Sequence, residues 1–84
     1  MNNFLEFVEK KIKENIKVES VVIVDNTSKH KKHKFFDMEK YHLKLNIESV
    51  YLKSLNPIEA QRKIMTILSD EMKTKIHALE IKIK

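Results

Sequence analysis

The sequence contains no glycine at any of its 84 positions. A phosphate-binding P-loop, a dinucleotide-binding GxGxxG turn and a GxxG loop of the KH-domain type all depend on glycine, so this chain can form none of them. It also contains no cysteine, which excludes disulfides, thiolate catalysis and any metal cluster held by its own sulfur. A chain of this length supports one compact core, and we expect residues 1–84 to form a single domain.

Apolar periodicity predicts two long helices and three strands. Asn56 followed by Pro57 is typical of a helix start, with the side chain of the first residue as N-cap. The predicted elements are a helix over 3–16, a strand over 18–25, a strand over 41–47, a helical turn at 50–52, a helix from Asn56 to about residue 75 and a strand over 76–84. This αββαβ order predicts an α+β fold in which the helices pack on one face of a three-stranded mixed sheet.

The net charge of +5 invites a nucleic-acid interpretation, but the cations are poorly suited to reading sequence. Arg62 is the single arginine, and lysine lacks the planar fork that recognises guanine edges. No apolar run approaches the length of a membrane span, and acidic residues interrupt the N-terminal region where a secretory signal would be apolar. We therefore expect a cytoplasmic protein with no membrane association.

Two of the four histidines lie in predicted strands. The alternation over 76–84 puts His77 in phase with the apolar residues of its strand, so this pattern alone favours a buried core histidine over a ligand. His42 alternates with the polar residues of its own strand, which predicts an exposed position. The adjacent carboxylates Asp70 and Glu71 are expected to face solvent near the end of the second long helix.

The other two histidines, His30 and His33, lie in the basic run KHKKHK at 29–34. The simplest interpretation is a solvated basic loop. The neighbouring lysines disfavour protonation of these imidazoles, however, and so favour the neutral form that binds metals. The same lysines would attract a site of net negative charge, such as a thiolate-ligated iron–sulfur cluster. A simple zinc or copper site formed with His77 is an alternative.

No residue pattern predicts catalysis. Ser28 and His30 are close in sequence, but the chain has neither a glycine-based nucleophile elbow nor an oxyanion-hole motif. We expect that the protein is not an enzyme.

The C-terminal third carries a recognisable combination of motifs. Arg62–Met65 (RKIM), Leu68–Met72 (LSDEM) and Ile76–Lys82 (IHALEIK) resemble the C-terminal signature of the BolA family. Upstream, Val24–His30 (VDNTSKH) is similar to the family's loop entry and His42–Ser49 (HLKLNIES) to its central strand. The resemblance covers nearly the whole chain.

This resemblance implies an αββαβ fold similar to class II KH domains without their GxxG loop. It also implies a non-enzymatic protein that forms a heterodimer with a monothiol glutaredoxin and shares with it a glutathione-ligated [2Fe–2S] cluster. No cofactor is expected on the isolated protein, and a homodimer stays an alternative. The implied role is iron–sulfur cluster assembly and trafficking, or iron sensing.

The resemblance also assigns ligands. It implies that His77 binds the cluster together with one loop histidine, His30 as first choice and His33 as the alternate, while His42 lies beside the ligands. The alternative function in this family is a nucleic-acid-binding transcriptional regulator. Its contact residues here would be Lys29, Lys31, Lys32, Lys34 and Arg62.

Overall fold

The computed structural model describes residues 3–27 and 40–84. Its helices and strands follow the predicted αββαβ order, and a short helix forms where the sequence predicts a helical turn after the second strand. In chain order the elements are α1 (Asn3–Asn15), β1 (Ser20–Asp25), β2 (Tyr41–Glu48), α2 (Val50–Lys53), α3 (Pro57–Ile67), α4 (Ser69–Thr74) and β3 (Ile76–Ile83).

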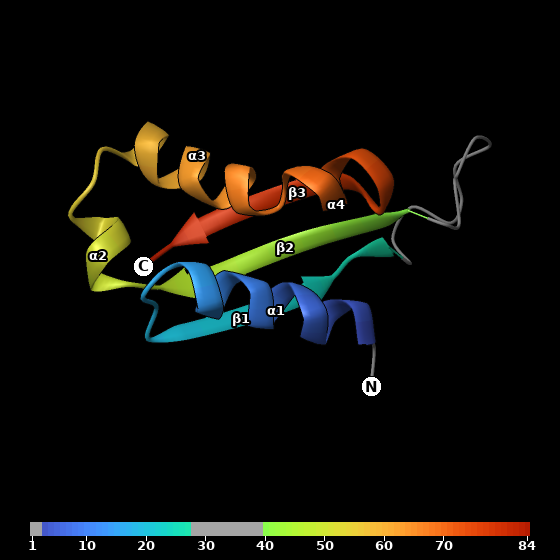
Figure 1. Ribbon diagram of the computed structural model, residues 1–84, viewed down its shortest axis with the longest axis horizontal. Helices are drawn as coiled ribbons and strands as arrows, with labels where there is room; N and C mark the ends of the chain where they lie inside the picture. Colours follow the sequence, from blue (N-terminus) through green and yellow to red (C-terminus); the bar gives the residue numbers. More distant parts are fainter. Residues whose placement is uncertain (1–2, 28–39) are drawn as a thin grey trace.

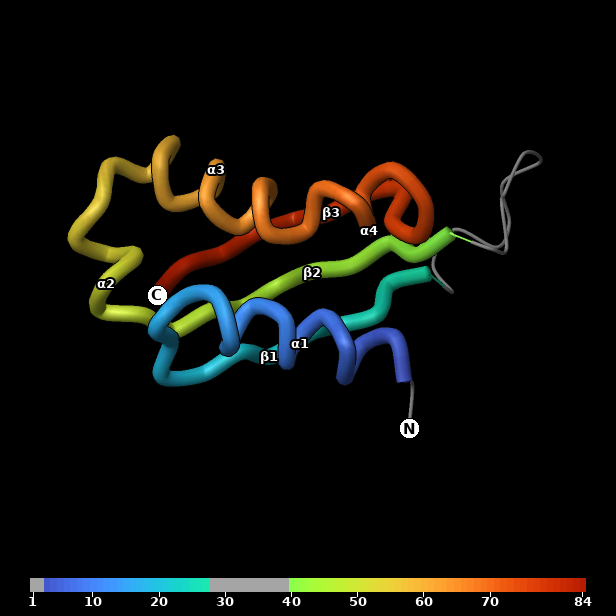
Figure 2. Tube along the Cα trace, viewed as in Figure 1, coloured from blue at the N-terminus to red at the C-terminus, as the bar shows by residue number. Residues whose placement is uncertain are grey.

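The three strands form one mixed sheet, as predicted, and their order in it is β1-β2-β3. β1 pairs antiparallel with β2, whereas β2 pairs parallel with β3. A parallel neighbour requires a crossover connection, and α2, α3 and α4 supply it. Figure 1 shows α1, α3 and α4 on the same side of this sheet, and the trace in Figure 2 shows the three strands running side by side behind them. The opposite face of the sheet carries no helix of the described residues.

The core lies between this sheet and the helices. From the sheet, the centre of β2 contributes Leu45 and Ile47, both completely buried. From the helices, α1 contributes Ile12 and α3 contributes Ile64, also completely buried, and Leu68 packs in the same cluster. The apolar face of β2, which results from its period-2 alternation, therefore packs against the apolar faces of α1 and α3 in one buried layer.

Side-chain caps define the ends of the crossover helices. Asn56 Oδ1 accepts a hydrogen bond of 2.8 Å from the backbone N–H of Ile58, and Pro57 occupies the first helical position, as predicted. Ser49, which is buried, accepts from Leu52 N–H and donates to the carbonyl oxygen of Lys17. That second bond connects the start of α2 to the segment that leads from α1 to β1.

The second long helix differs slightly from its prediction, because it is divided at Leu68 into α3 and α4. Leu68 has φ −99° and ψ 18°, outside the helical range. Its N–H nevertheless donates to Ile64 O, and its carbonyl oxygen accepts from Met72 N–H. The helical hydrogen bonding therefore continues across the irregularity, and α4 leads directly into β3.

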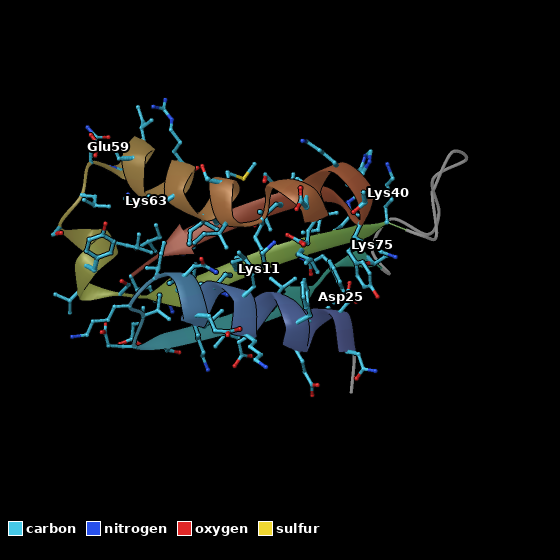
Figure 3. All side chains as sticks on the ribbon, in the orientation of Figure 1. Lys11, Asp25, Lys40, Glu59, Lys63 and Lys75 are labelled. Atoms are coloured by element: carbon cyan, nitrogen blue, oxygen red, sulfur yellow. The ribbon has the colours of Figure 1, made fainter. Side chains whose placement is uncertain are left out.

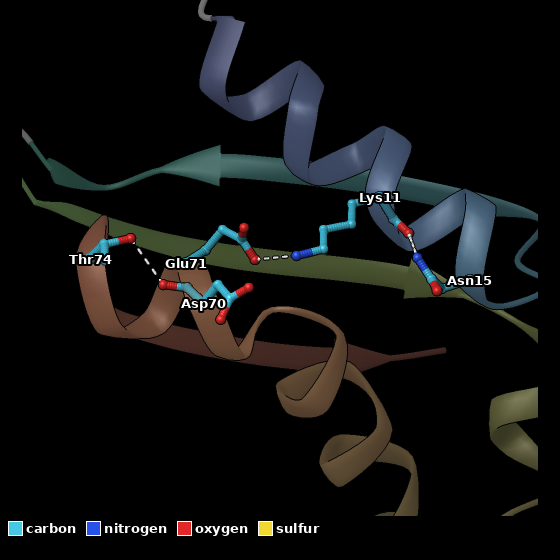
Figure 4. Close-up of polar contacts among 5 residues, drawn as sticks. All are labelled: Lys11, Asn15, Asp70, Glu71 and Thr74. Atoms are coloured by element: carbon cyan, nitrogen blue, oxygen red, sulfur yellow. Dashed lines mark hydrogen bonds and ion pairs between the residues drawn. The ribbon is translucent and has the colours of Figure 1, made fainter.

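The prediction that Glu71 faces solvent is wrong. This residue is only 8% exposed, and its Oε1 accepts a 2.8 Å bond from Lys11 Nζ on α1, as Figure 4 shows. Asp70, by contrast, is exposed as expected. The prediction failed for Glu71 because Lys11 of α1 reaches across to it, a tertiary contact that the helical period of one segment does not reveal.

Backbone geometry agrees with the absence of glycine. Within residues 3–27 and 40–84 no residue has a positive φ, so nowhere in this part of the chain does the backbone adopt a conformation that favours glycine. The helices of this same part are too short or too polar to cross a lipid bilayer.

Candidate functional site

His42 and His77 lie next to each other at one end of the sheet. His42 is the second residue of β2 and His77 is the second residue of β3, and their ring centroids are 5.0 Å apart with an interplanar angle of 48°. Two imidazoles that ligate one tetrahedral ion at about 2.0–2.1 Å have centroids about 5 Å apart. The separation is therefore short enough for both rings to belong to one site.

An irregularity in the pairing of β2 and β3 brings His77 to the surface. Tyr41 pairs with Ile76, but the next residue, His42, pairs with Ala78, so β3 has one extra residue at this point. Ile76 is buried, while His77 and Ala78 are both exposed. A bulge of this kind changes which face the following residues occupy. The prediction that His77 is a core histidine is therefore wrong, because the alternation on which it rested is interrupted at His77 itself.

His42 lies on the face of the sheet that the described helices leave uncovered. Its neighbours along β2 on this face are Lys44 and Asn46, whereas the residues between them are buried on the helix side. This confirms the predicted face, although the His42 side chain is half-buried rather than fully exposed. A groove of about 230 Å³ adjoins it, with Ala78 and Glu80 of β3 in its lining.

A hydrogen-bonded turn connects the end of β1 to His42. Asp25 Oδ1 accepts from the backbone N–H of Thr27 at 2.9 Å and also from the Thr27 hydroxyl. The same hydroxyl oxygen accepts from the backbone N–H of His42 at 3.2 Å, and the backbone N–H of Asn26 donates to His42 O at 2.7 Å. Asp25 and Thr27 thus hold the chain against His42 just before residue 28. The sequence indicates a turn here, but not that it is bonded to β2.

Several predicted site residues lie outside the described residues. They share the segment 28–39 and comprise the candidate ligands His30 and His33 and the candidate nucleic-acid contacts Lys29, Lys31, Lys32 and Lys34. Within 3–27 and 40–84, no group of three or more His, Cys, Asp or Glu side chains is arranged to hold a metal ion. His42 and His77 alone therefore do not make a complete ligand set in this part of the chain, and any further protein ligand has to come from elsewhere.

The remaining candidate, Arg62, belongs to a different surface. It is exposed on α3 and lines a groove of about 410 Å³ with Glu59 and Lys63 of the same helix and Asn15 of α1. Because α3 packs over the helix side of the sheet, this groove and the histidine pair lie on opposite sides of the molecule. The structure therefore does not bring Arg62 together with His42 and His77.

The fold is similar to that of solved BolA domains. The BolA domain of SufE1 from Arabidopsis thaliana matches with a TM-score of 0.83 and 25% identity, over 100% of this chain and 93% of that chain. BolA1 from Arabidopsis thaliana matches with a TM-score of 0.81 and 23% identity, also over 100% of this chain and 93% of that chain. BolA1 from Mus musculus matches with a TM-score of 0.78 and 18% identity, over 100% of this chain and 66% of that chain. No curated protein sequence matches the chain.

A family model described as BolA-like protein matches residues 12–84. The matched region begins in the second half of α1 and includes all three strands, the crossover helices and both described histidines. It contains every motif on which the resemblance in the sequence rested, from Val24 to Lys82. The chain therefore belongs to the BolA-like family.

Proposed function

We propose that this protein is a non-enzymatic partner of a monothiol glutaredoxin and shares with it a glutathione-ligated [2Fe–2S] cluster. The role would be iron–sulfur cluster assembly, trafficking or iron sensing. Family membership supports the proposal, and one observation carries it: His77 is exposed on an edge strand, beside a second imidazole. An exposed imidazole on an edge strand is accessible to a cluster carried by another protein.

The chemistry of the two histidines suits such a cluster. Neutral imidazole ligates iron, and replacing thiolates by imidazoles on one iron lowers the negative charge of the cluster and raises its reduction potential, as in Rieske centres. We assign the ligand role to His77, because its side chain is more exposed than that of half-buried His42. His42 contacts the His77 ring and restricts its orientation.

A second ligand would come from His30, with His33 as the alternate. The segment that contains both begins after Thr27 and ends before Lys40, and both flanking residues are close to His42: Thr27 by its hydrogen bond, Lys40 by its place two residues before it. Because the two ends of this segment lie at the same end of the sheet as His77, a ligand from it is within reach of the site. The hydrogen bonds of Asp25 and Thr27 would then set the position from which the segment starts.

Anaerobic cluster reconstitution tests the proposal. A monothiol glutaredoxin is loaded with cluster in the presence of glutathione, with and without this protein, and examined by visible circular dichroism and size-exclusion chromatography. We expect a new spectrum and a heterodimer with the wild-type protein. We expect the spectrum of glutaredoxin alone with His77→Ala, and the wild-type result with Lys82→Ala, a control at another exposed position of β3.

An unchanged spectrum together with no complex on the column would contradict the proposal. The alternative function, a BolA-type nucleic-acid-binding transcriptional regulator, would then become the leading hypothesis. Duplex binding with a steep salt dependence and equal affinity for unrelated sequences would indicate non-specific electrostatic attraction. Preference for one sequence at physiological salt would support the regulator, and loss of binding in Arg62→Ala would place α3 at the interface.

A further inference from the structure

A second concave site lies at the same end of the sheet as the histidine pair. It is a pocket of about 570 Å³, within the usual size range for small-molecule sites. Its walls come from the start of α1, the end of β1, the start of β2 and the end of α4. The lining residues are Phe4, Asp25, Thr27, Lys40, Tyr41, Thr74 and Lys75. Lys75 precedes His77 by two residues, so their Cα atoms are at most about 7 Å apart.

The charges in this pocket favour an anion. Lys40 and Lys75 both line it, and neither forms an ion pair with any other residue of the described part of the chain. The carboxylate of Asp25, which also lines the pocket, already accepts two hydrogen bonds from Thr27. Figure 3 shows Lys40, Lys75 and Asp25 at the same end of the molecule. Among the described lining residues, two cations and one anion leave one net positive charge, which matches a single carboxylate better than a doubly charged phosphate.

Two aromatic rings form the apolar part of the pocket. The rings of Phe4 and Tyr41 are stacked, with centroids 4.6 Å apart and an interplanar angle of 23°. They form an aromatic wall of the pocket between α1 and β2. The backbone N–H of Tyr41 also donates to Lys75 O at 2.8 Å, so the start of β2 and the end of α4 are held together across the pocket.

We propose that this pocket binds a carboxylate of a short peptide, with Lys40 and Lys75 as the cations that recognise it. The choice of glutathione as that peptide rests on the proposed function, because glutathione is the carboxylate-bearing molecule expected beside the cluster. The pocket lies on the helix side of the sheet and the histidines on the open side. A peptide held by its carboxylate at the end of the sheet would therefore approach the histidines around the ends of β2 and β3.

Titration of the isolated protein with glutathione, followed by ¹⁵N–¹H NMR, tests this proposal without glutaredoxin or a cluster. We expect saturable shifts of the backbone amides of Tyr41, Thr74 and Lys75. The double variant Lys40→Gln/Lys75→Gln should bind about tenfold more weakly, since it loses both ion pairs to the carboxylate. The control Lys63→Gln/Lys82→Gln removes the same number of charges elsewhere and should bind as the wild type does.

Two further ligands test whether the pocket recognises a carboxylate. Glutathione dimethyl ester lacks both carboxylates and should produce no saturable shifts, and inorganic phosphate should bind more weakly than glutathione. The proposal is overturned if glutathione gives no saturable shifts, if both double variants weaken binding equally, or if the ester or phosphate binds as well as glutathione. Because no cluster is involved, failure here and failure of cluster sharing are separate results.

Discussion

The ion pair between Lys11 and Glu71 connects α1 to α4, and its burial makes its contribution to stability measurable. The Nζ–Oε1 distance is 2.8 Å, and the two side chains are 28% and 10% exposed. Exposed ion pairs contribute about 0–1 kcal/mol, whereas removing one partner of a fully buried pair costs about 3–5 kcal/mol. This pair lies between those limits. We therefore expect Lys11→Met to lower the free energy of unfolding by about 2 kcal/mol, because it leaves the Glu71 carboxylate without its partner.

The same helix offers a matched control. Lys13 pairs with Glu9 at 2.7 Å, but these side chains are 49% and 41% exposed, so Lys13→Met should cost less than about 0.5 kcal/mol. Urea unfolding followed by circular dichroism measures both variants. In thermal unfolding, the Lys11→Met variant should melt about 8–16 °C lower than the wild type. Equal stability of the two variants would refute the reasoning. The double variant Lys11→Met/Glu71→Met should regain part of the loss, since no buried charge is left unpaired.

Three further substitutions test the core, a helix cap and the exposure of the candidate ligand. Leu45→Ala removes a completely buried side chain at the centre of β2 and should lower the free energy of unfolding by about 2–5 kcal/mol in urea titrations; a loss below about 1 kcal/mol would contradict its central position in the core. Asn56→Ala removes the acceptor of the 2.8 Å capping bond at the start of α3 and should cost about 1 kcal/mol, with Asn56→Asp as the variant that retains the cap. His77→Ala should change the melting temperature little, by the equivalent of about 0.5 kcal/mol at most, because the side chain is exposed. A large loss in that variant would mean that His77 supports the core after all.

The sequence predicted the parts of the fold that depend on local signals. The alternation of β2 was clear because its inner face is entirely apolar, with Leu43, Leu45 and Ile47 all buried. The start of α3 followed from Asn56 and Pro57, whose capping geometry is a property of a few adjacent residues. Family motifs added the expectation of a candidate site at His77.

The parts that failed depend on contacts between distant segments. Periodicity placed His77 on the buried face, because a single extra residue in β3 cannot be recognised from alternation within that strand. Periodicity also placed Glu71 in solvent, because its burial depends on the approach of Lys11, 60 residues earlier in the chain. The proximity of His42 and His77 depends on the parallel register of two strands separated by the whole crossover. Pairwise geometry of this kind comes only from the folded structure.

The central claim is that His77 is a ligand of a cluster shared with glutaredoxin, and pulsed EPR of the reduced cluster tests it most directly. The complex is prepared with glutathione and with ¹⁵N-histidine incorporated into this protein alone. We predict couplings from directly bound histidine nitrogen in the wild type, loss of one of these couplings in His77→Ala, and an unchanged set in His42→Ala. No histidine coupling in the wild type, or the same couplings in His77→Ala as in the wild type, would contradict the claim.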